Sequence, residues 1–103
     1  MKKLFIAAFM FVSSFGTNVM ADGHAIKMGI ILGFTGPIES LTPAMAASAE
    51  LAFKEASDSG SLLGGKKIEV VRADSTCVDS AAATAAAEGV ISQGVAAIMG
   101  ADC

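Results

Sequence analysis

Three short apolar runs alternate along the chain with two alanine-rich segments, and this alternation limits the folds that the chain can adopt. The runs cover residues 25–32, 66–74 and 95–100. The intervening segments, residues 43–57 and 79–94, have the length and composition of helices. A strand, helix, strand, helix, strand order is typical of a parallel α/β sheet with right-handed crossovers. The sequence therefore predicts the opening of a parallel α/β fold.

Both predicted helices carry signals at their ends. Thr42 precedes Pro43, which suits a helix start with Thr42 as the N-cap and the proline in the first turn. Asp79 is the expected cap of the second helix, while Gly60 and Gly94 are the expected stops. The third apolar run is too short and too apolar to be expected at the edge of a sheet.

The faces of the two helices follow from the 3.6-residue period. Glu50 and Lys54 are expected to form an exposed i, i+4 ion pair on the first helix. The face of that helix predicted to pack on the sheet holds Met45, Ala49, Ala52, Phe53 and Ala56. On the second helix, a polar side with Thr84, Glu88 and Ser92 lies opposite Ala82, Ala86 and Val90.

The N-terminus has the order of a secretory signal peptide. Two lysines precede an apolar run over residues 4–12, and small residues lead up to Ala21. We expect cleavage after Ala21, which makes residues 1–21 the signal peptide and starts the mature chain at Asp22. The alternative is a membrane anchor, but polar residues dilute a run that only just reaches the roughly 20 residues that a span needs.

The charge of the mature chain argues against nucleic acid as a partner. Without the two lysines of the signal, five basic residues stand against ten acidic ones, a net charge of −5. The sequence has no basic patch and no interleaved aromatic residues of the kind that binds nucleic acid. After removal of the signal peptide, the expected mature chain is a short, acidic, exported segment.

Cys77 and Cys103 are the only cysteines, and each follows a predicted strand. In an oxidising compartment such a pair is expected to form a disulfide. If the second and third strands are neighbours, about 4.8 Å apart, their ends are compatible with the roughly 4.4–6.8 Å Cα separation of a disulfide. An unpaired or intermolecular thiol is the next alternative. A metal site comes last and none is expected, because the only histidine, His24, lies near the mature N-terminus.

The loop over residues 33–40 could hold a ligand. It follows the first strand and leads into a helix whose N-terminal amides can hold an anion such as a carboxylate. Gly33 and Gly36 allow the backbone to come close to a ligand, and Thr35 and Ser40 offer hydroxyl groups. The alternative is a plain connection between strand and helix, which uses the same residue types.

Other site chemistries find less support in the sequence. The glycine spacing at positions 29, 33 and 36 does not match a dinucleotide-binding motif. Asp74 is explained by its position at the end of a strand, and Asp79 by its role as a helix cap. Asp102 is expected at the same end of the sheet, but a single acid is not a site. A hydrolase would need a nucleophile elbow or a metal cluster. No catalytic residue and no cofactor are therefore expected.

Four segments taken in order resemble a known family. They read IKMGIILGFTGPIES, AASAELAFKEA, GGKKIEVVRADSTC and VAAIMGADC. Together they resemble the periplasmic binding proteins for branched-chain amino acids, which are the leucine/isoleucine/valine-type receptors of ABC importers, and their amide- and urea-binding relatives. The resemblance runs over residues 26–103, nearly the whole mature chain.

The resemblance implies two α/β lobes that close over a small ligand and are then read by a permease in the inner membrane, with no bond broken. It implies a disulfide at the positions of Cys77 and Cys103. The ligand would meet the loop after the first strand, at Thr35, Gly36 and Leu41, and the segment after the third strand that starts at Cys103. Many amino-acid binders have a tyrosine where this chain has Leu41.

Residues 22–103 are thus expected to be the N-terminal part of the first lobe of a periplasmic solute-binding protein. Such a fragment is not expected to bind an amino acid with useful affinity by itself. Two alternatives stay open: the extracellular ligand-sensing domain of a receptor, and a small exported α/β protein that completes its sheet by oligomerising.

Overall fold

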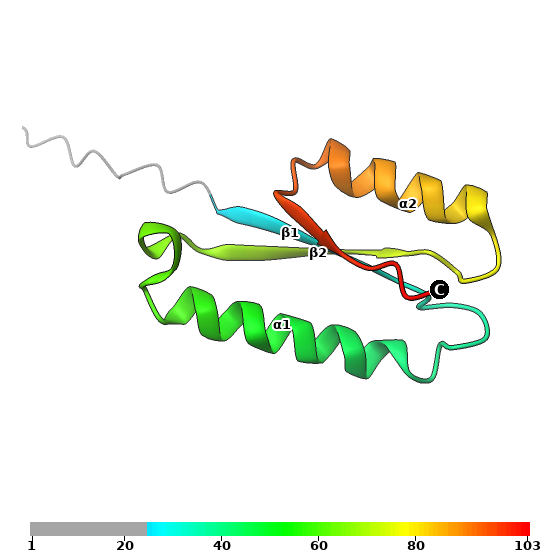
Figure 1. Ribbon diagram of the computed structural model, residues 1–103, viewed down its shortest axis with the longest axis horizontal. Helices are drawn as coiled ribbons and strands as arrows, with labels where there is room; N and C mark the ends of the chain where they lie inside the picture. Colours follow the sequence, from blue (N-terminus) through cyan, green and yellow to red (C-terminus); the bar gives the residue numbers. More distant parts are fainter. Residues whose placement is uncertain (1–24) are drawn as a thin grey trace, which may run out of the picture.

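The computed structural model describes residues 25–103, which form a three-stranded parallel sheet covered by two helices (Figure 1). The expected cleavage after Ala21 lies outside the described residues, as does His24. The predicted α/β class and the order of its elements are confirmed. The elements are β1 (Ile26–Leu32), α1 (Thr42–Asp58), the 3₁₀ turn η1 (Leu62–Gly65), β2 (Ile68–Asp74), α2 (Ser80–Ser92) and β3 (Ala97–Met99).

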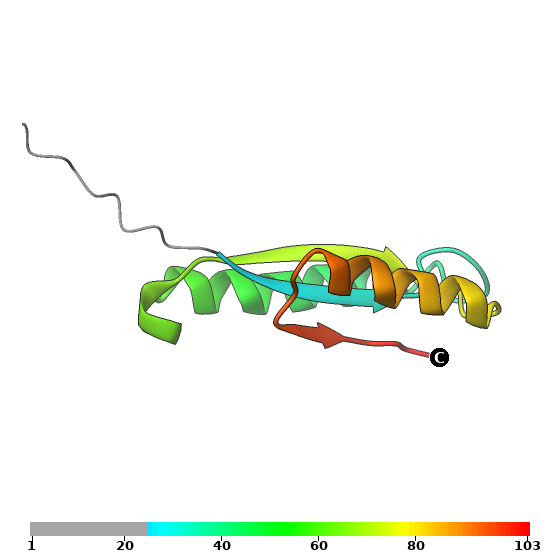
Figure 2. The same cartoon turned by 90° about the horizontal axis from the view of Figure 1, so that it is seen from above.

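The strands follow the order β2, β1, β3, and all of them run parallel (Figure 2). β1 pairs along its whole length with β2, from Ile26 opposite Ile68 to Leu32 opposite Asp74, and over a shorter stretch with β3. The condition that the second and third strands are neighbours is not met, and the expectation that the third strand does not lie at an edge is wrong, because β3 is an edge strand of the described sheet. The cause is the path of the chain, which crosses from β1 to β2 and then returns past β1 to β3.

The core forms because β1 is buried on both faces, as expected for a central parallel strand. Ile30 and Leu32 are buried against Ala46 of α1. On the opposite face a Cβ added at Gly29 would lie 3.5 Å from Val90 Cγ2 of α2, so glycine lets this helix approach the sheet closely. Figure 1 shows the two helices on opposite sides of the strands.

The start of α1 differs from the prediction. Leu41 occupies the cap position and makes no side-chain hydrogen bond, so Thr42 is not the N-cap. Instead Thr42 is fully buried, and its hydroxyl donates to the Gly33 carbonyl at 3.0 Å. The hydroxyl is thus engaged by the end of β1 and does not serve the helix amides. Gly60 follows the end of α1 with a φ of +69°, as expected for a stop.

The buried face of α1 is rotated from the one predicted. Ala46 is fully buried, whereas Met45 is 43% exposed and Ala52 is also exposed. The buried Thr42 anchors the helix, and the positions that follow it at intervals of three or four residues face the sheet. The positions on this face that were predicted correctly are Ala49, Phe53 and Ala56.

The predicted ion pair between Glu50 and Lys54 is also wrong. Glu50 pairs instead with Arg72 of β2, whose Nε and Nη2 lie 2.5 and 2.8 Å from the two carboxylate oxygens. The planar guanidinium matches a carboxylate in this two-bond geometry, and the hydrogen bonds from Arg72 lower the pKa of Glu50. Lys54 pairs with Asp58 one turn further along α1.

α2 agrees with its prediction at both ends. The Asp79 side chain accepts hydrogen bonds from the amides of Ala81 at 2.8 Å and Ala82 at 3.3 Å, which is an N-cap. Gly94 follows the helix with a φ of +79°. The predicted polar side of α2 is exposed, and the predicted apolar side is buried or half-buried. Within residues 25–103, neither helix is long and apolar enough to cross a membrane.

Candidate functional site

Three loops that are far apart in the sequence meet at the carboxyl end of the sheet. They are residues 33–41 after β1, residues 75–79 after β2 and residues 101–103 after β3. We call this set of loops the rim. Figure 1 shows the end of the chain lying close to the loop after β1 at this rim. In open parallel sheets, ligands bind beyond this end of the strands.

Asp74, the last residue of β2, holds the first loop in place. Its carboxylate accepts a hydrogen bond from the Thr35 hydroxyl at 2.5 Å and another from the Thr35 amide at 3.3 Å. It also accepts the Thr76 amide at 2.8 Å. The bond from the Thr35 hydroxyl, with help from the amides, lowers the pKa of Asp74. One carboxylate therefore joins the loops after β1 and β2.

Asp102 makes a similar connection from the third loop. The Gly33 amide donates to both oxygens of Asp102, at 3.1 and 3.3 Å. On its other side, the Gly33 carbonyl accepts the bond from Thr42. The first residue after β1 is thus fixed by partners on α1 and beyond β3, so the loop leaves the sheet in a defined direction.

The disulfide joins the second and third loops. Cys77 and Cys103 are bonded, with their Cα atoms 5.5 Å apart. They do not meet because their strands are adjacent, since β1 lies between these strands. They meet because both loops bend over the end of β1, where a Cβ added at Gly33 would lie only 2.6 Å from Cys77 Sγ. A glycine at position 33 is what gives the disulfide room to cross.

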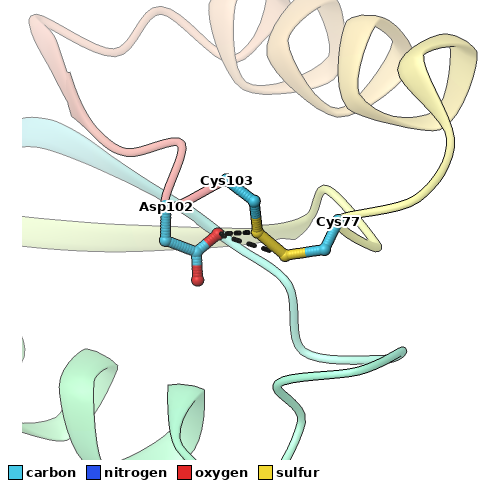
Figure 3. Close-up of side chains that lie close together, drawn as sticks. All are labelled: Cys77, Asp102 and Cys103. Atoms are coloured by element: carbon cyan, nitrogen blue, oxygen red, sulfur yellow. Dashed lines mark hydrogen bonds between the residues drawn. A yellow bond between two sulfur atoms is a disulfide. The ribbon is translucent and has the colours of Figure 1, made fainter.

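A carboxylate oxygen lies beside both sulfur atoms. Asp102 Oδ1 is 3.8 Å from Cys77 Sγ and 3.2 Å from Cys103 Sγ (Figure 3). Because bonded sulfurs carry no proton, these are close contacts and not hydrogen bonds. The three side chains form a group whose potential metal-ligating atoms lie within 4.8 Å of one another.

Gly36, in the loop after β1, occupies a position that only glycine fits without strain. Gly36 has a φ of +96°, and a Cβ there would lie 2.4 Å from the Thr76 carbonyl oxygen. Thr76 and Cys77 also have positive φ values, of 61° and 66°. Such conformations are costly for residues with a side chain, and they persist where surrounding contacts hold them. The hydrogen bond from the Thr76 amide to the Asp74 carboxylate is one such contact.

The four residues predicted to meet a ligand all lie on the rim but do not form one cluster. Thr35 and Gly36 are exposed beside the loop after β2, and the proton of the Thr35 hydroxyl points to Asp74. Cys103 is exposed and bonded to Cys77. Leu41 is 60% exposed at the start of α1, and its backbone bonds are local.

A cleft of about 500 Å³ lies on the α2 side of the disulfide. Of the four predicted ligand residues, it includes Cys103 alone. Ser75 lines this cleft; it is 3% exposed, and its hydroxyl has no hydrogen-bond partner in the described structure. The lining residues are Ser75, Cys77, Val78, Asp79, Ser80, Ala83, Thr84 and Cys103.

The sequence interpretation missed the two carboxylates that organise the rim. Asp74 was assigned only a strand-end role, and Asp102 was set aside as a single acid. Asp74 closes β2 and Asp102 lies three residues after the end of β3, and the carboxyl ends of parallel strands share one end of the sheet. That shared position was a signal, but the partners Thr35 and Gly33 depend on the strand order, which the sequence did not reveal.

The family of the chain follows from this topology and from comparison with known proteins. A family model described as periplasmic binding protein matches residues 25–102. The chain belongs to this family, and its β-α-β-α-β order fits the opening of a type I lobe. Membership implies a small-molecule ligand and a periplasmic location, and proteins of this family are generally binders rather than enzymes. No curated protein matches the sequence.

Proposed function

We propose that the chain belongs to the solute-binding component of an ABC importer, which binds a branched-chain or related amino acid, or a small amide, and delivers it to a permease. Residues 22–103 would then form the first part of lobe 1, with the rim as part of the wall that meets the solute. The family supports solute binding in general. The solute class and the importer are our proposal.

The observation that carries the proposal is the difference between the two helix starts at the rim. α2 begins with the carboxylate of Asp79 already bonded to its first amides. α1 begins without a side-chain cap and without an acid in its first turn. A helix N-terminus attracts negative charge, so the start of α1 is the better place for the carboxylate of an amino acid.

The neighbouring groups suit the rest of such a ligand. The Thr35 hydroxyl donates its hydrogen bond to Asp74, so its oxygen is left to accept a hydrogen bond from an ammonium or amide N–H. Leu41, exposed at the start of α1, offers apolar surface to an aliphatic side chain. Thr35, Gly36, Leu41 and Cys103 remain the proposed contact residues.

Calorimetric titration tests the proposal. The protein as its gene encodes it is titrated with leucine, isoleucine, valine and short aliphatic amides. Leu41→Ala should weaken binding of the best solute about tenfold, because roughly 1.4 kcal/mol of apolar contact is lost. Leu51→Ala is the matched control, since Leu51 is a similarly exposed leucine of α1, at 57%, nearer its middle. Equal losses in both variants, or no heat with any of these solutes, would contradict the proposal.

Export is a separate part of the proposal. We propose that residues 1–21 direct the chain to the periplasm and are removed after Ala21. N-terminal sequencing of the protein from the periplasmic fraction should begin at Asp22. Recovery of the uncleaved chain in the membrane fraction would favour the anchor instead.

A further inference from the structure

The group formed by Cys77, Asp102 and Cys103 offers a chemistry that solute binding does not use. We infer that, once the disulfide is reduced, these three side chains bind a thiophilic divalent cation such as Zn²⁺. Two cysteine sulfurs and a carboxylate oxygen are among the ligands that zinc prefers, with water free to take the fourth position. The inference does not depend on which solute the protein binds.

The distances already agree with a tetrahedral zinc centre. With Zn–S near 2.3 Å and Zn–O near 2.1 Å, a sulfur and an oxygen ligand of one zinc ion lie about 3.6 Å apart. Asp102 Oδ1 lies 3.8 Å from Cys77 Sγ and 3.2 Å from Cys103 Sγ. After reduction the two sulfurs have to separate to about 3.8 Å while they stay within reach of the same carboxylate oxygen.

The carboxylate is held in position by the backbone. Both oxygens of Asp102 accept the Gly33 amide, and such outer contacts orient metal ligands. Cys103 is exposed, and Cys77 and Asp102 are half-buried, so a cation can reach the group from solvent. Figure 3 shows the carboxylate directed at the sulfur pair. Two thiolates and one carboxylate carry three negative charges, which a divalent cation largely neutralises.

The chemistry requires a reductant, and a phosphine supplies it. The phosphine gives two electrons to the sulfur–sulfur bond, which breaks into two thiols, while the phosphine takes an oxygen from water and becomes its oxide. The two protons on the thiols come from that same water molecule. Zn²⁺ then forms two Zn–S bonds and displaces both protons into the buffer.

Zinc titration of the reduced full-length protein, against a chromophoric chelator and without oxygen, tests the inference. We expect one Zn²⁺ per chain, two protons released, and binding at least 100-fold tighter than to the oxidised protein. Asp102→Asn should weaken binding about tenfold or more. Asp79→Asn is the matched control, because asparagine also caps a helix and Asp79 lies outside the group; it should change affinity less than twofold.

Circular dichroism separates binding from unfolding. If reduction loosens the chain, zinc should restore the far-UV spectrum of the oxidised protein in the wild type. Reduced protein that binds zinc no more tightly than Cys77→Ser would overturn the inference. So would an unchanged affinity in Asp102→Asn, or a reduced chain that neither binds zinc nor recovers its spectrum.

Discussion

The two ends of the sheet are held together in different ways. At the carboxyl end, side chains link loops that are distant in the sequence, through Asp74, Asp102 and the disulfide between Cys77 and Cys103. At the amino end the neighbouring segments are joined largely by main-chain bonds, such as that from the Ile26 amide to a carbonyl 2.8 Å away on Lys67.

The local structure of the amino end agrees with this difference. The turn η1 exposes both of its leucines, Leu62 at 39% and Leu63 at 58%. The side-chain bond that flanks the turn joins α1 directly to β2: the Ser57 hydroxyl accepts the Ile68 amide at 3.2 Å. The carboxyl end therefore carries most of the long-range side-chain restraints, whereas the amino end has the bond from Lys27 Nζ to the Gln93 carbonyl. The restraints of the carboxyl end coincide with the surface that we propose for binding. Functional sites need such fixed geometry, whereas a connecting turn does not.

Removal of the disulfide should have the largest effect. The double variant Cys77→Ser, Cys103→Ser should lose about 3–4 kcal/mol of unfolding free energy, because the unfolded chain regains the freedom of a 26-residue separation. Urea denaturation measures the loss. The wild type in reductant should match the double variant, and Ser61→Ala, an exposed residue at the amino end, should change stability by less than about 0.5 kcal/mol. An equally stable double variant would show that the disulfide does not restrain the rim.

Two glycines with positive φ give a second comparison. Gly36→Ala should cost about 2–3 kcal/mol, because its Cβ would lie 2.4 Å from the Thr76 carbonyl and its φ is +96°. Gly64→Ala in η1 has a φ of +71° but nothing within 4 Å of the new Cβ, so it should cost about 1 kcal/mol. Thermal unfolding of both variants measures the difference. Equal costs would mean that the first loop yields as easily as the turn.

The sequence predicted the elements well because their signals are local. The apolar runs, the cap at Asp79 and the stops at Gly60 and Gly94 depend on neighbouring residues. The family-level function also followed from short segments in order. The predictions that were wrong concern contacts between elements. Glu50, for example, pairs with Arg72 of β2 and not with Lys54 of its own helix.

The candidate site was predicted at the right end of the sheet but with an incomplete set of residues. Thr35 and Gly36 were expected to serve a ligand, and their contacts with Asp74 and with the Thr76 carbonyl were not foreseen. The pairing of Cys77 with Cys103 was expected from the oxidising compartment and from the resemblance, but the supporting argument from adjacent strands fails, because β1 lies between β2 and β3. Strand order decides which loops touch, and an alternation of strands and helices is compatible with several orders.

Two buried hydroxyls at opposite ends of α1 test whether restraint differs between the ends. Thr42→Val leaves the Gly33 carbonyl without its side-chain donor and should cost about 1–2 kcal/mol. Ser57→Ala removes the acceptor of the Ile68 amide and should cost a similar amount. Amide hydrogen exchange distinguishes the two variants. Thr42→Val should speed exchange of the Thr35 amide, whereas Ser57→Ala should not. Faster exchange at Thr35 in both variants would argue that α1 transmits any loosening along its length.

The smallest expected effect is the response of the rim to acid. Because the Thr35 hydroxyl lowers the pKa of Asp74 below its ordinary 3.8, the carboxylate stabilises the fold fully above about pH 3.8. This contribution is lost as the pH falls through the lowered pKa of the folded state. The Thr35 amide resonance should therefore shift in an NMR titration below about pH 4.

Asp74→Asn should remove that shift, because an amide does not titrate. Asp58→Asn is the control from the amino end: Lys54 lowers the pKa of Asp58, but that pair lies on α1 and touches neither loop. It should leave the Thr35 titration unchanged. A titration that survives in Asp74→Asn would assign the shift to another acid of the rim, and the first loop would then be held mainly by Asp102 and the backbone.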